Sequence, residues 1–304
     1  MLARYSHSLW LAIGSLIIAG ILALVGTLQL SLDKRIDAHV MKAEELAHLP
    51  KGESLKPAML GYHHLGADML WLQLLQVLGK KKNTASEYEW IYHAVDVITT
   101  LDPQYSYAYY VGGVVLTNYA NRIDLSNRLL EKGHRENPGE WNLPFLLGYN
   151  HYFGLGDAAK GAEYIQIASR TPHAPDFLPG LATRMYAEAG NPDVALEFLE
   201  TLWKENPELA IREKLEDRAK EVLIERDLRS LEHAVAQFHR QYHEFPKRLD
   251  DLVTKGYVTR IPLEPFGGSY RLDGETGQVT SSSHPDRLKV FRRDLESGIT
   301  VGVQ

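Results

Sequence analysis

The sequence predicts a mainly α-helical protein with an N-terminal transmembrane helix, an α-solenoid of helical hairpins and a small α+β unit near the C-terminus. Three observations support this prediction. Residues 9–30 are almost wholly apolar, and four prolines recur at nearly constant spacing through the middle of the chain. Short segments containing Tyr, Val and Leu alternate with Gly- and Asp-rich turns over residues 242–283, which is typical of a small hairpin.

The prolines define the period of the central region. Pro103, Pro138, Pro172 and Pro207 are separated by 35, 34 and 35 residues. Each follows an apolar segment of helical periodicity, and proline does not continue a helix. A period near 34 residues is typical of stacked helix–turn–helix units. Such stacks bury their cores between neighbouring units and present a curved surface, so this region predicts binding before catalysis.

These units resemble the tetratricopeptide repeat. The unit that ends at Pro207 carries pattern residues at Tyr186, Gly190, Ala195, Leu199, Leu202 and Pro207. The preceding unit has Trp141 and the pair Leu147-Gly148 in place, but its loop at 154–157 is longer than the pattern. The unit before it keeps the spacing, with Asn121, Ser126 and Gly133 where Gly and two Ala are usual. The resemblance implies a helical repeat domain over residues 58–225, whose first unit is the most degenerate.

The N-terminal apolar segment predicts a membrane anchor. Residues 5–32 contain no Asp, Glu, Lys or Arg, and the twenty-two residues 9–30 are enough to span a bilayer as a helix. A cleaved signal peptide is the alternative, although the segment is longer than usual and no convincing cleavage site follows it. Residues 1–8 form a short tail before the anchor, and residues 31–57 form a linker after it.

The flanking charges leave the orientation nearly balanced, with Arg4 on one side and Lys34 and Arg35 beside Asp33 on the other, and they slightly favour a cytoplasmic C-terminal part. We expect the long C-terminal part to be exported, because a short tail before a single anchor commonly stays in the cytoplasm. The sequence therefore predicts a single-pass bacterial inner-membrane protein with a periplasmic soluble part. The absence of cysteine excludes disulfides, a cysteine nucleophile and thiolate metal sites. The net charge of −6 argues against nucleic-acid binding.

A charged helical segment follows Pro207. Its apolar residues recur on one face from Leu215 to Phe238, which favours a helix that caps the last repeat over a free coiled coil. Residues 226–283 then form the predicted helix-plus-hairpin unit, and residues 284–304 form a C-terminal tail.

The hairpin region resembles the globular part of type II secretion major pseudopilins. The matching residues, in order, are Phe245-Pro246, Leu252, Gly256-Tyr257, Pro262, Pro265-Phe266-Gly267 and Tyr270. Glu264 stands where that family has Asp, and Phe266 where it has Trp. The calcium loop and the pilin cleavage signature have no counterpart, so the resemblance implies a pseudopilin-like unit without a calcium site, and not a pilus subunit.

The histidines raise the question of a metal site. His64 and Asp68 are four residues apart beside His63, and His239 and His243 have the same spacing on a second helix. No HExxH motif surrounds either pair, and no nucleophile, phosphate-loop or dinucleotide motif occurs. We therefore expect no enzymatic activity, no cofactor and no metal. The alternative is a metal-dependent or accessory enzyme that uses His63, His64 and Asp68.

Aromatic residues suggest a binding surface instead. Alignment to the repeat pattern places a set of Tyr, Phe and Asn side chains on the inner, concave side. The leading candidate groove residues are Tyr107, Tyr110, Asn118, Asn142, Phe145, Tyr149 and Tyr152, and the same alignment also places Val114, Thr117, Phe153, Asp176 and Thr183 on that side. Tyr and Asn combine contact area with hydrogen bonding at interfaces. The alternative is that many of these rings fill the core between repeats.

The sequence thus predicts a membrane-anchored scaffold that binds protein partners through its groove. The pseudopilin-like unit suggests, by analogy, a cell-envelope assembly such as a pilus, a secretion system or an associated transporter. A third possibility is a structural cap that stiffens a larger membrane complex through its anchor.

Overall fold

A computed structural model describes residues 18–28, 49–79 and 84–288 of the chain, which fold into a mainly α-helical protein. The elements, in order, are α3 (Gly52–Ala58), α4 (His63–Leu78), α5 (Ala85–Leu101), α6 (Ser106–Asn118), α7 (Ile123–Glu136), α8 (Asn142–Tyr149), the π-helix η1 (Asn150–Gly154), α9 (Ala158–Ser169), α10 (Leu178–Glu188), α11 (Pro192–Glu205), α12 (Leu209–Tyr242), α13 (Leu249–Thr254), β1 (Tyr270–Leu272) and β2 (Val279–Ser281).

The predicted anchor falls only partly on the described residues. Residues 18–28 are helical and expose their apolar side chains, whereas 9–17, 29 and 30 lie outside the described part of the chain. Within the described residues, no helix has both the length and the apolar character needed to cross a membrane. The predicted tail 1–8, most of the linker 31–57 and the end of the C-terminal tail also lie outside them.

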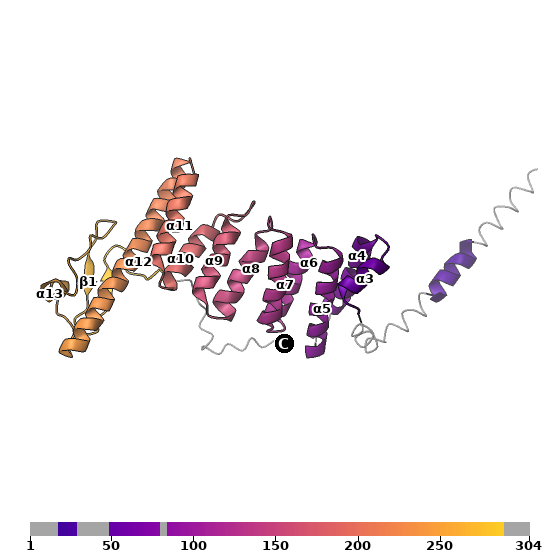
Figure 1. Ribbon diagram of the computed structural model, residues 1–304, viewed down its shortest axis with the longest axis horizontal. Coiled ribbons are helices and arrows are strands. Elements are labelled where there is room, and N and C mark those ends of the chain that lie inside the picture. The colour runs from indigo at the N-terminus through magenta and orange to yellow at the C-terminus, as the bar shows by residue number, and fades with distance from the viewer. Residues whose placement is uncertain (1–17, 29–48, 80–83, 289–304) are drawn as a thin grey trace, which may run out of the picture.

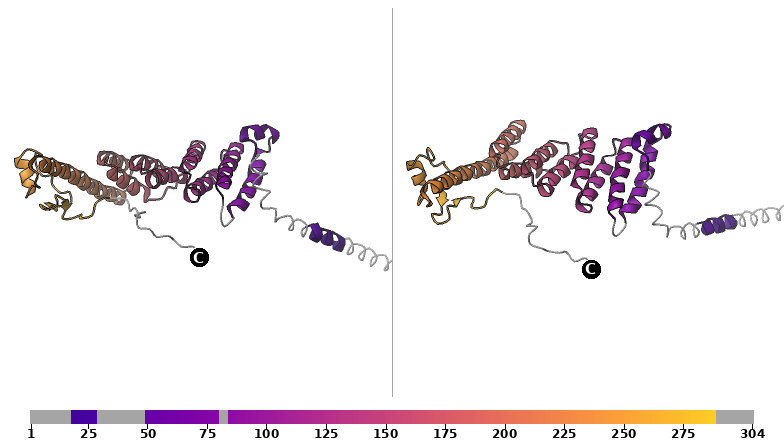
Figure 2. Two further views of the ribbon diagram at one scale, coloured as in Figure 1. Left: turned by 90° about the horizontal axis from the view of Figure 1, so that it is seen from below. Right: turned by 60° about the horizontal axis from the view of Figure 1, so that its bottom comes forward.

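From α4 to α12 each helix packs against the next, and the helices lie side by side in a row (Figure 1). Each of the four periodic prolines follows the second helix of a pair, namely α5, α7, α9 or α11. The row remains visible in the two turned views, with α3 and α4 at one end and α12 toward the other (Figure 2). The even spacing of the prolines therefore reflects an even spacing of helix ends.

Glycines allow the closest helix contacts in the row. A Cβ atom on Gly148 of α8 would lie 2.7 Å from the side chain of Ile165 and 3.0 Å from the carbonyl oxygen of Gly161, both on α9. A Cβ atom on Gly133 of α7 would lie 2.6 Å from the ring of Tyr109 on α6. These distances are too short for any larger residue without movement of the helices, so the glycines set the spacing within both pairs.

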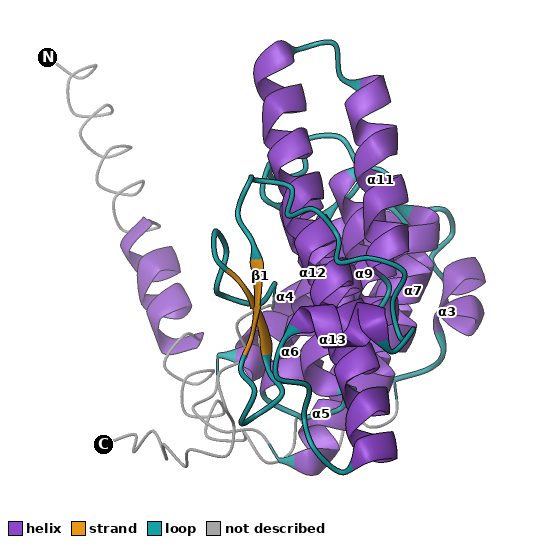
Figure 3. Cartoon of the chain, turned by 90° about the vertical axis from the view of Figure 1, so that its left-hand side faces the viewer, coloured by secondary structure: helices purple, strands orange, loops and turns teal. Residues whose placement is uncertain are grey.

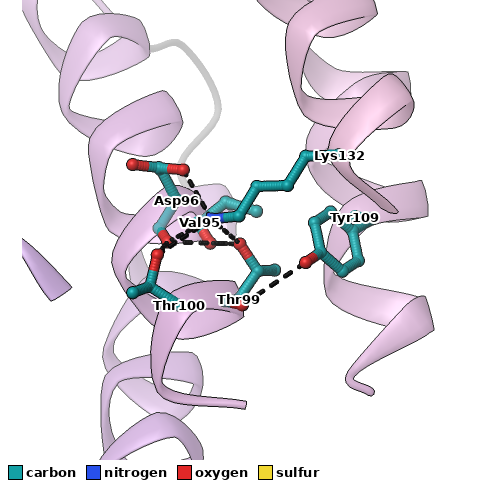
Figure 4. Close-up of polar contacts among 6 residues, drawn as sticks. All are labelled: Val95, Asp96, Thr99, Thr100, Tyr109 and Lys132. Carbon is teal, nitrogen blue, oxygen red and sulfur yellow. Dashed lines mark hydrogen bonds and ion pairs between the residues drawn. The ribbon is translucent and has the colours of Figure 1, made fainter. Parts of the chain in front are cut away.

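A polar cluster joins α5 to α7 (Figure 4). The Lys132 ammonium lies 2.7 Å from a carboxylate oxygen of Asp96 and donates to the hydroxyls of Thr99 and Thr100 at 3.1 Å and 2.9 Å. The Tyr109 hydroxyl donates to the Thr99 carbonyl, and burial raises the pKa of Tyr109 to about 12. Because these hydrogen bonds connect residues of three helices, the cluster helps to fix how α5, α6 and α7 lie against one another.

A substitution at Ala195 tests how the last helix pair, α10 and α11, is packed. It is fully buried on α11 in a core with Phe198 and Leu199. We expect Ala195→Leu to lower the free energy of unfolding by about 1–3 kcal/mol, because overpacking forces neighbouring side chains off their rotamers. Denaturant unfolding of Val194→Leu, a change at the half-exposed neighbouring position, serves as the control. Equal midpoints for the two variants would contradict the predicted register of this unit.

Helix α12 belongs to two cores. Leu215, Ala219 and Val222 in its first part pack with α10 and α11, as expected of a helix that caps the row. Its second part packs with α13 and the hairpin, through residues such as Leu231 and Phe238. The expected boundary at residue 225 falls inside this helix, which contains no Gly or Pro in its 34 residues.

The predicted hairpin is present. Strands β1 and β2 are antiparallel, with Tyr270 opposite Ser281 and Leu272 opposite Val279, and they lie beside α12 (Figure 3). The connecting turn closes through the Gly277 N–H, which donates to the Asp273 carbonyl while Gly277 adopts a φ of 74°. The Tyr270 hydroxyl donates to Asp227 of α12 at 2.9 Å, which attaches the hairpin to the helix.

Candidate functional site

The candidate site is a line of mainly aromatic side chains on α6 and α8, which are the first helices of two successive pairs. On α6 this line of side chains occupies positions 107, 110, 114 and 118, which share one face of the helix. Tyr109, Gly112 and Leu116 lie on the opposite face, which is buried. On α8 and η1 it occupies positions 142, 145, 149 and 153 at similar spacing. Because α6 packs against α8, the two stretches lie on neighbouring helices.

We call this surface the aromatic face and define it as Tyr107, Tyr110, Asn118, Asn142, Phe145, Tyr149 and Phe153. Tyr107 and Phe153 are 58% and 44% exposed, and Asn118 is also exposed. The remaining members are half-buried, so each presents an edge to solvent while its other side packs on the core. Large apolar rings held in this way are typical of binding surfaces.

Ring contacts hold several members in place. Tyr107 lies against Trp71 of α4 with ring centroids 5.7 Å apart, and Phe145 lies edge-on to Trp141 at 5.8 Å. The rings of Tyr149 and Phe153 are 4.8 Å apart. Side chains fixed before binding lose less conformational entropy when a partner docks.

A buried polar network lies beneath the aromatic face. Asn150, the first residue of η1, is fully buried, and its amide nitrogen donates to Ser126 and Asn127 of α7 at 3.0 Å and 2.8 Å. Its amide oxygen lies 2.9 Å from the hydroxyl of Thr117 on α6. Ser126 in turn donates to the Gly113 carbonyl. The network joins α6, α7 and η1, and so fixes the π-helical turn that presents Phe153.

The structure corrects the predicted position of Tyr152. This ring is 1% exposed within the core of the α9–α11 region, and its hydroxyl donates to Glu188 of α10 at 2.6 Å. The wider π-helical turn changes the angle between successive side chains, so Tyr152 does not share the side occupied by Tyr149. Thr183 is likewise fully buried and donates to the Pro179 carbonyl, whereas Asp176 is exposed.

Two polar groups near this surface lack hydrogen-bond partners among the described residues. The amide oxygen of Asn142 accepts no hydrogen bond, although it is buried. Neither ring nitrogen of His151 has a partner, its ring stacks on Tyr164 at 5.4 Å, and burial lowers the pKa of His151. Unpaired buried polar groups cost free energy and are rare in folded proteins.

The histidine cluster considered for a metal does not assemble. His64 pairs with Asp102 at 3.1 Å, and its ring contacts His63 at a centroid distance of 4.4 Å. His239 stacks on Phe245, while His243 ends α12 in a left-handed conformation. In the part of the chain that the structure describes, no group of three or more His, Asp or Glu side chains could hold a metal ion.

A cavity of about 310 Å³ lies between α10, α12 and residues 284–288. Of its charged lining residues, Arg287, Glu225 and Glu221 take part in ion pairs. The Arg287 guanidinium donates to both carboxylate oxygens of Glu225 at 2.7 Å and 2.9 Å, and to Glu232 at 2.6 Å. Arg229 also donates to Glu225, and Arg218 pairs with Glu221. The cavity therefore lies at the intramolecular interface where residues 284–288 pack on α12. The aromatic face is the stronger candidate for binding a partner.

No protein-family model, curated protein or solved structure matches this chain. Function must therefore be inferred from the residues themselves.

Proposed function

We propose that this protein is a membrane-anchored scaffold of the tetratricopeptide type, an α-solenoid that binds a protein partner through its aromatic face. The observation that carries the proposal is the partial exposure of aligned Tyr and Phe side chains on neighbouring helices, at positions that the repeat pattern assigns to the concave side. Interface hot spots are enriched in such residues, which combine a large contact area with a polar edge.

The cellular setting is part of the same proposal. The apolar segment 9–30 would hold the scaffold in the bacterial inner membrane with its soluble part in the periplasm, which raises the effective concentration of membrane partners. The pseudopilin-like hairpin unit supports a role in a cell-envelope assembly such as a pilus, a secretion system or an associated transporter. No specific observation favours the metal-dependent enzyme, because the histidines and acidic residues are not grouped as ligands in the described residues.

Photo-crosslinking from the aromatic face tests the proposal. We expect a benzoylphenylalanine residue in place of Phe153 or Asn118 to form an adduct with the same protein in intact cells, because both positions lie on one exposed face. Tyr119, which is 71% exposed but turned away from that face, provides the matched control position. Mass spectrometry of the adduct identifies the partner and its compartment.

A double substitution then measures the energetic contribution of the face. With the crosslinker at Asn118, Tyr107→Ala combined with Phe153→Ala should reduce adduct yield about tenfold or more, since loss of hot-spot side chains typically costs 2 kcal/mol or more. Thermal unfolding of the same variant should change little, because both side chains are substantially exposed. Equal adduct formation from all three positions, or no adduct at all, would count against partner binding by this surface.

A further inference from the structure

A second surface, at the N-terminal end of the row, also lacks a partner in the structure. Helix α4 lies at this end (Figures 1 and 2). It buries Ala67, Trp71 and Leu74 on the side that contacts α5 and α6. On its opposite side Leu65, Met69 and Leu72 are 57%, 57% and 61% exposed. We call these three residues the α4 stripe.

The α4 stripe is unusual for a surface helix. Its members are spaced by four and three residues, so they form a continuous line along one face. Leu60 and Tyr62, just before the helix, are 86% and 72% exposed and enlarge the apolar area. A helix that is apolar on both sides is normally buried on both sides. No element of the described chain covers the stripe.

We propose that the α4 stripe lies on the surface of a lipid bilayer. This inference rests on the proposed function, because it takes residues 9–30 to be the membrane anchor. The chain enters the described fold at Leu49, whose carbonyl lies 2.7 Å from a ring nitrogen of His93 on α5. Residues 31–48 connect the anchor to this point and can reach at most about 60 Å, since a residue spans no more than about 3.3–3.6 Å. The tether therefore keeps Leu49, which packs on the core at the α4 end of the row, within about 60 Å of the bilayer.

The local charge also favours a lipid surface. The described residues 49–79 contain two lysines and two carboxylate residues, and three further lysines follow directly in the sequence at 80–82, whereas the whole chain carries a net charge of −6. An apolar helix face combined with basic residues is the pattern of helices that lie in the interface of an anionic membrane. A second copy of the chain would have to bring the same positive charge against itself.

The absence of cysteine makes a direct test possible in the full chain. Leu72→Cys and Leu209→Cys each introduce the only thiol, and the two leucines are 61% and 71% exposed. Leu209 lies at the start of α12, well away from α4 along the row (Figure 1), and serves as the matched control. Each variant is labelled with an environment-sensitive fluorophore. It is then reconstituted in vesicles of phosphatidylethanolamine and phosphatidylglycerol that carry brominated acyl chains.

We expect the label at position 72 to lose about half of its emission to the brominated lipid, since interfacial helices insert their apolar face about 5–10 Å into the headgroup and acyl boundary. The label at position 209 should not be quenched. Replacing phosphatidylglycerol with phosphatidylcholine should reduce the quenching at position 72, because the negative surface charge is then lost.

The other outcomes overturn the inference in distinguishable ways. Flotation of the vesicles in a density gradient shows whether the protein is bound to them. If the protein floats with the vesicles but the label at position 72 is not quenched, residues 9–30 still act as the anchor and the α4 stripe does not contact lipid. A blue-shifted emission without quenching would instead indicate a protein contact, including one with a second copy. If the protein does not float with the vesicles, both the anchor and the lipid contact are wrong. Equal quenching at both positions would show that contact with lipid is not specific to the α4 stripe, and would overturn the inference in that way.

Discussion

Replacing Arg287 with alanine is expected to lower the free energy of unfolding by about 3 kcal/mol, the lower end of the range for removing one partner of a buried ion pair. Glu225 is only 3% exposed, and Arg287 binds both of its carboxylate oxygens. Without Arg287 the buried carboxylate keeps, among the described residues, only Arg229 as a charged partner. Residues 284–288 should then detach from α12, which limited proteolysis would detect as faster cleavage in this segment.

The matched control is Arg248→Ala. Arg248 also pairs with a carboxylate, Asp250, but both side chains are largely exposed. Exposed pairs contribute about 0–1 kcal/mol, so this variant should unfold almost as the parent does. If the two variants unfold alike, the pairing of Arg287 with Glu225 contributes little to stability.

The same pair predicts an acid dependence. Burial alone would raise the pKa of Glu225, but its hydrogen bonds and charge interactions with Arg287 and Arg229 outweigh this and lower it. A carboxyl group with a lowered pKa in the folded state stabilises the fold above its unfolded pKa, and this contribution is lost as the pH falls. Between about pH 6 and pH 3 the parent should therefore lose more stability than Arg287→Ala does.

Replacing Glu264 with glutamine is expected to destabilise the hairpin unit by about 2–4 kcal/mol, because hydrogen bonds to a charged group contribute about 1.5–3 kcal/mol each. The Glu264 carboxylate is 6% exposed and accepts hydrogen bonds from the Phe266 and Gly268 N–H groups at 2.9 Å and 2.7 Å. It also accepts from the hydroxyls of Ser281 and Ser283. A glutamine side chain would keep one acceptor oxygen, but its NH₂ group would face either the backbone N–H groups or the serine hydroxyls, which are themselves donors to Glu264.

Thermal unfolding of Glu264→Gln, compared with Glu275→Gln in the exposed turn between the strands, measures this effect. Proteolysis within residues 265–283 should rise only in the first variant, while cleavage in α4 to α11 stays unchanged. Identical melting temperatures for both variants would show that the carboxylate does not hold the hairpin in place.

Much of the fold was predictable because its signals are local. Helix ends follow from the prolines, helix faces follow from apolar periodicity, and the hairpin follows from turn residues such as Gly277. The capping role of α12 followed from the apolar residues along one of its faces. These features depend on neighbours within a few turns of the chain, which a single sequence displays directly.

The candidate site was less predictable, because it depends on contacts between distant residues. Repeat alignment assumes continuous α-helix through position 152, and the π-helical turn from Asn150 breaks that assumption. The sequence spacing grouped His64 with Asp68, yet in the structure His64 pairs with Asp102, which follows the last residue of α5. The partnership of Arg287 with Glu225 spans 62 residues and has no sequence pattern. Phe153 could have been ranked higher, since it follows Tyr149 at the helical spacing of four.

Helix α12 has a mechanical consequence. Its 34 residues form a rod about 50 Å long at a rise of 1.5 Å per residue. One end is clamped in the core of the last helix pair and the other in the core beneath the hairpin. With no Gly or Pro between the two clamps, the rod has no built-in hinge. A force applied to the hairpin would therefore be transmitted through α12 to the row of helices. The hairpin and the last helix pair would rotate together as one rigid body.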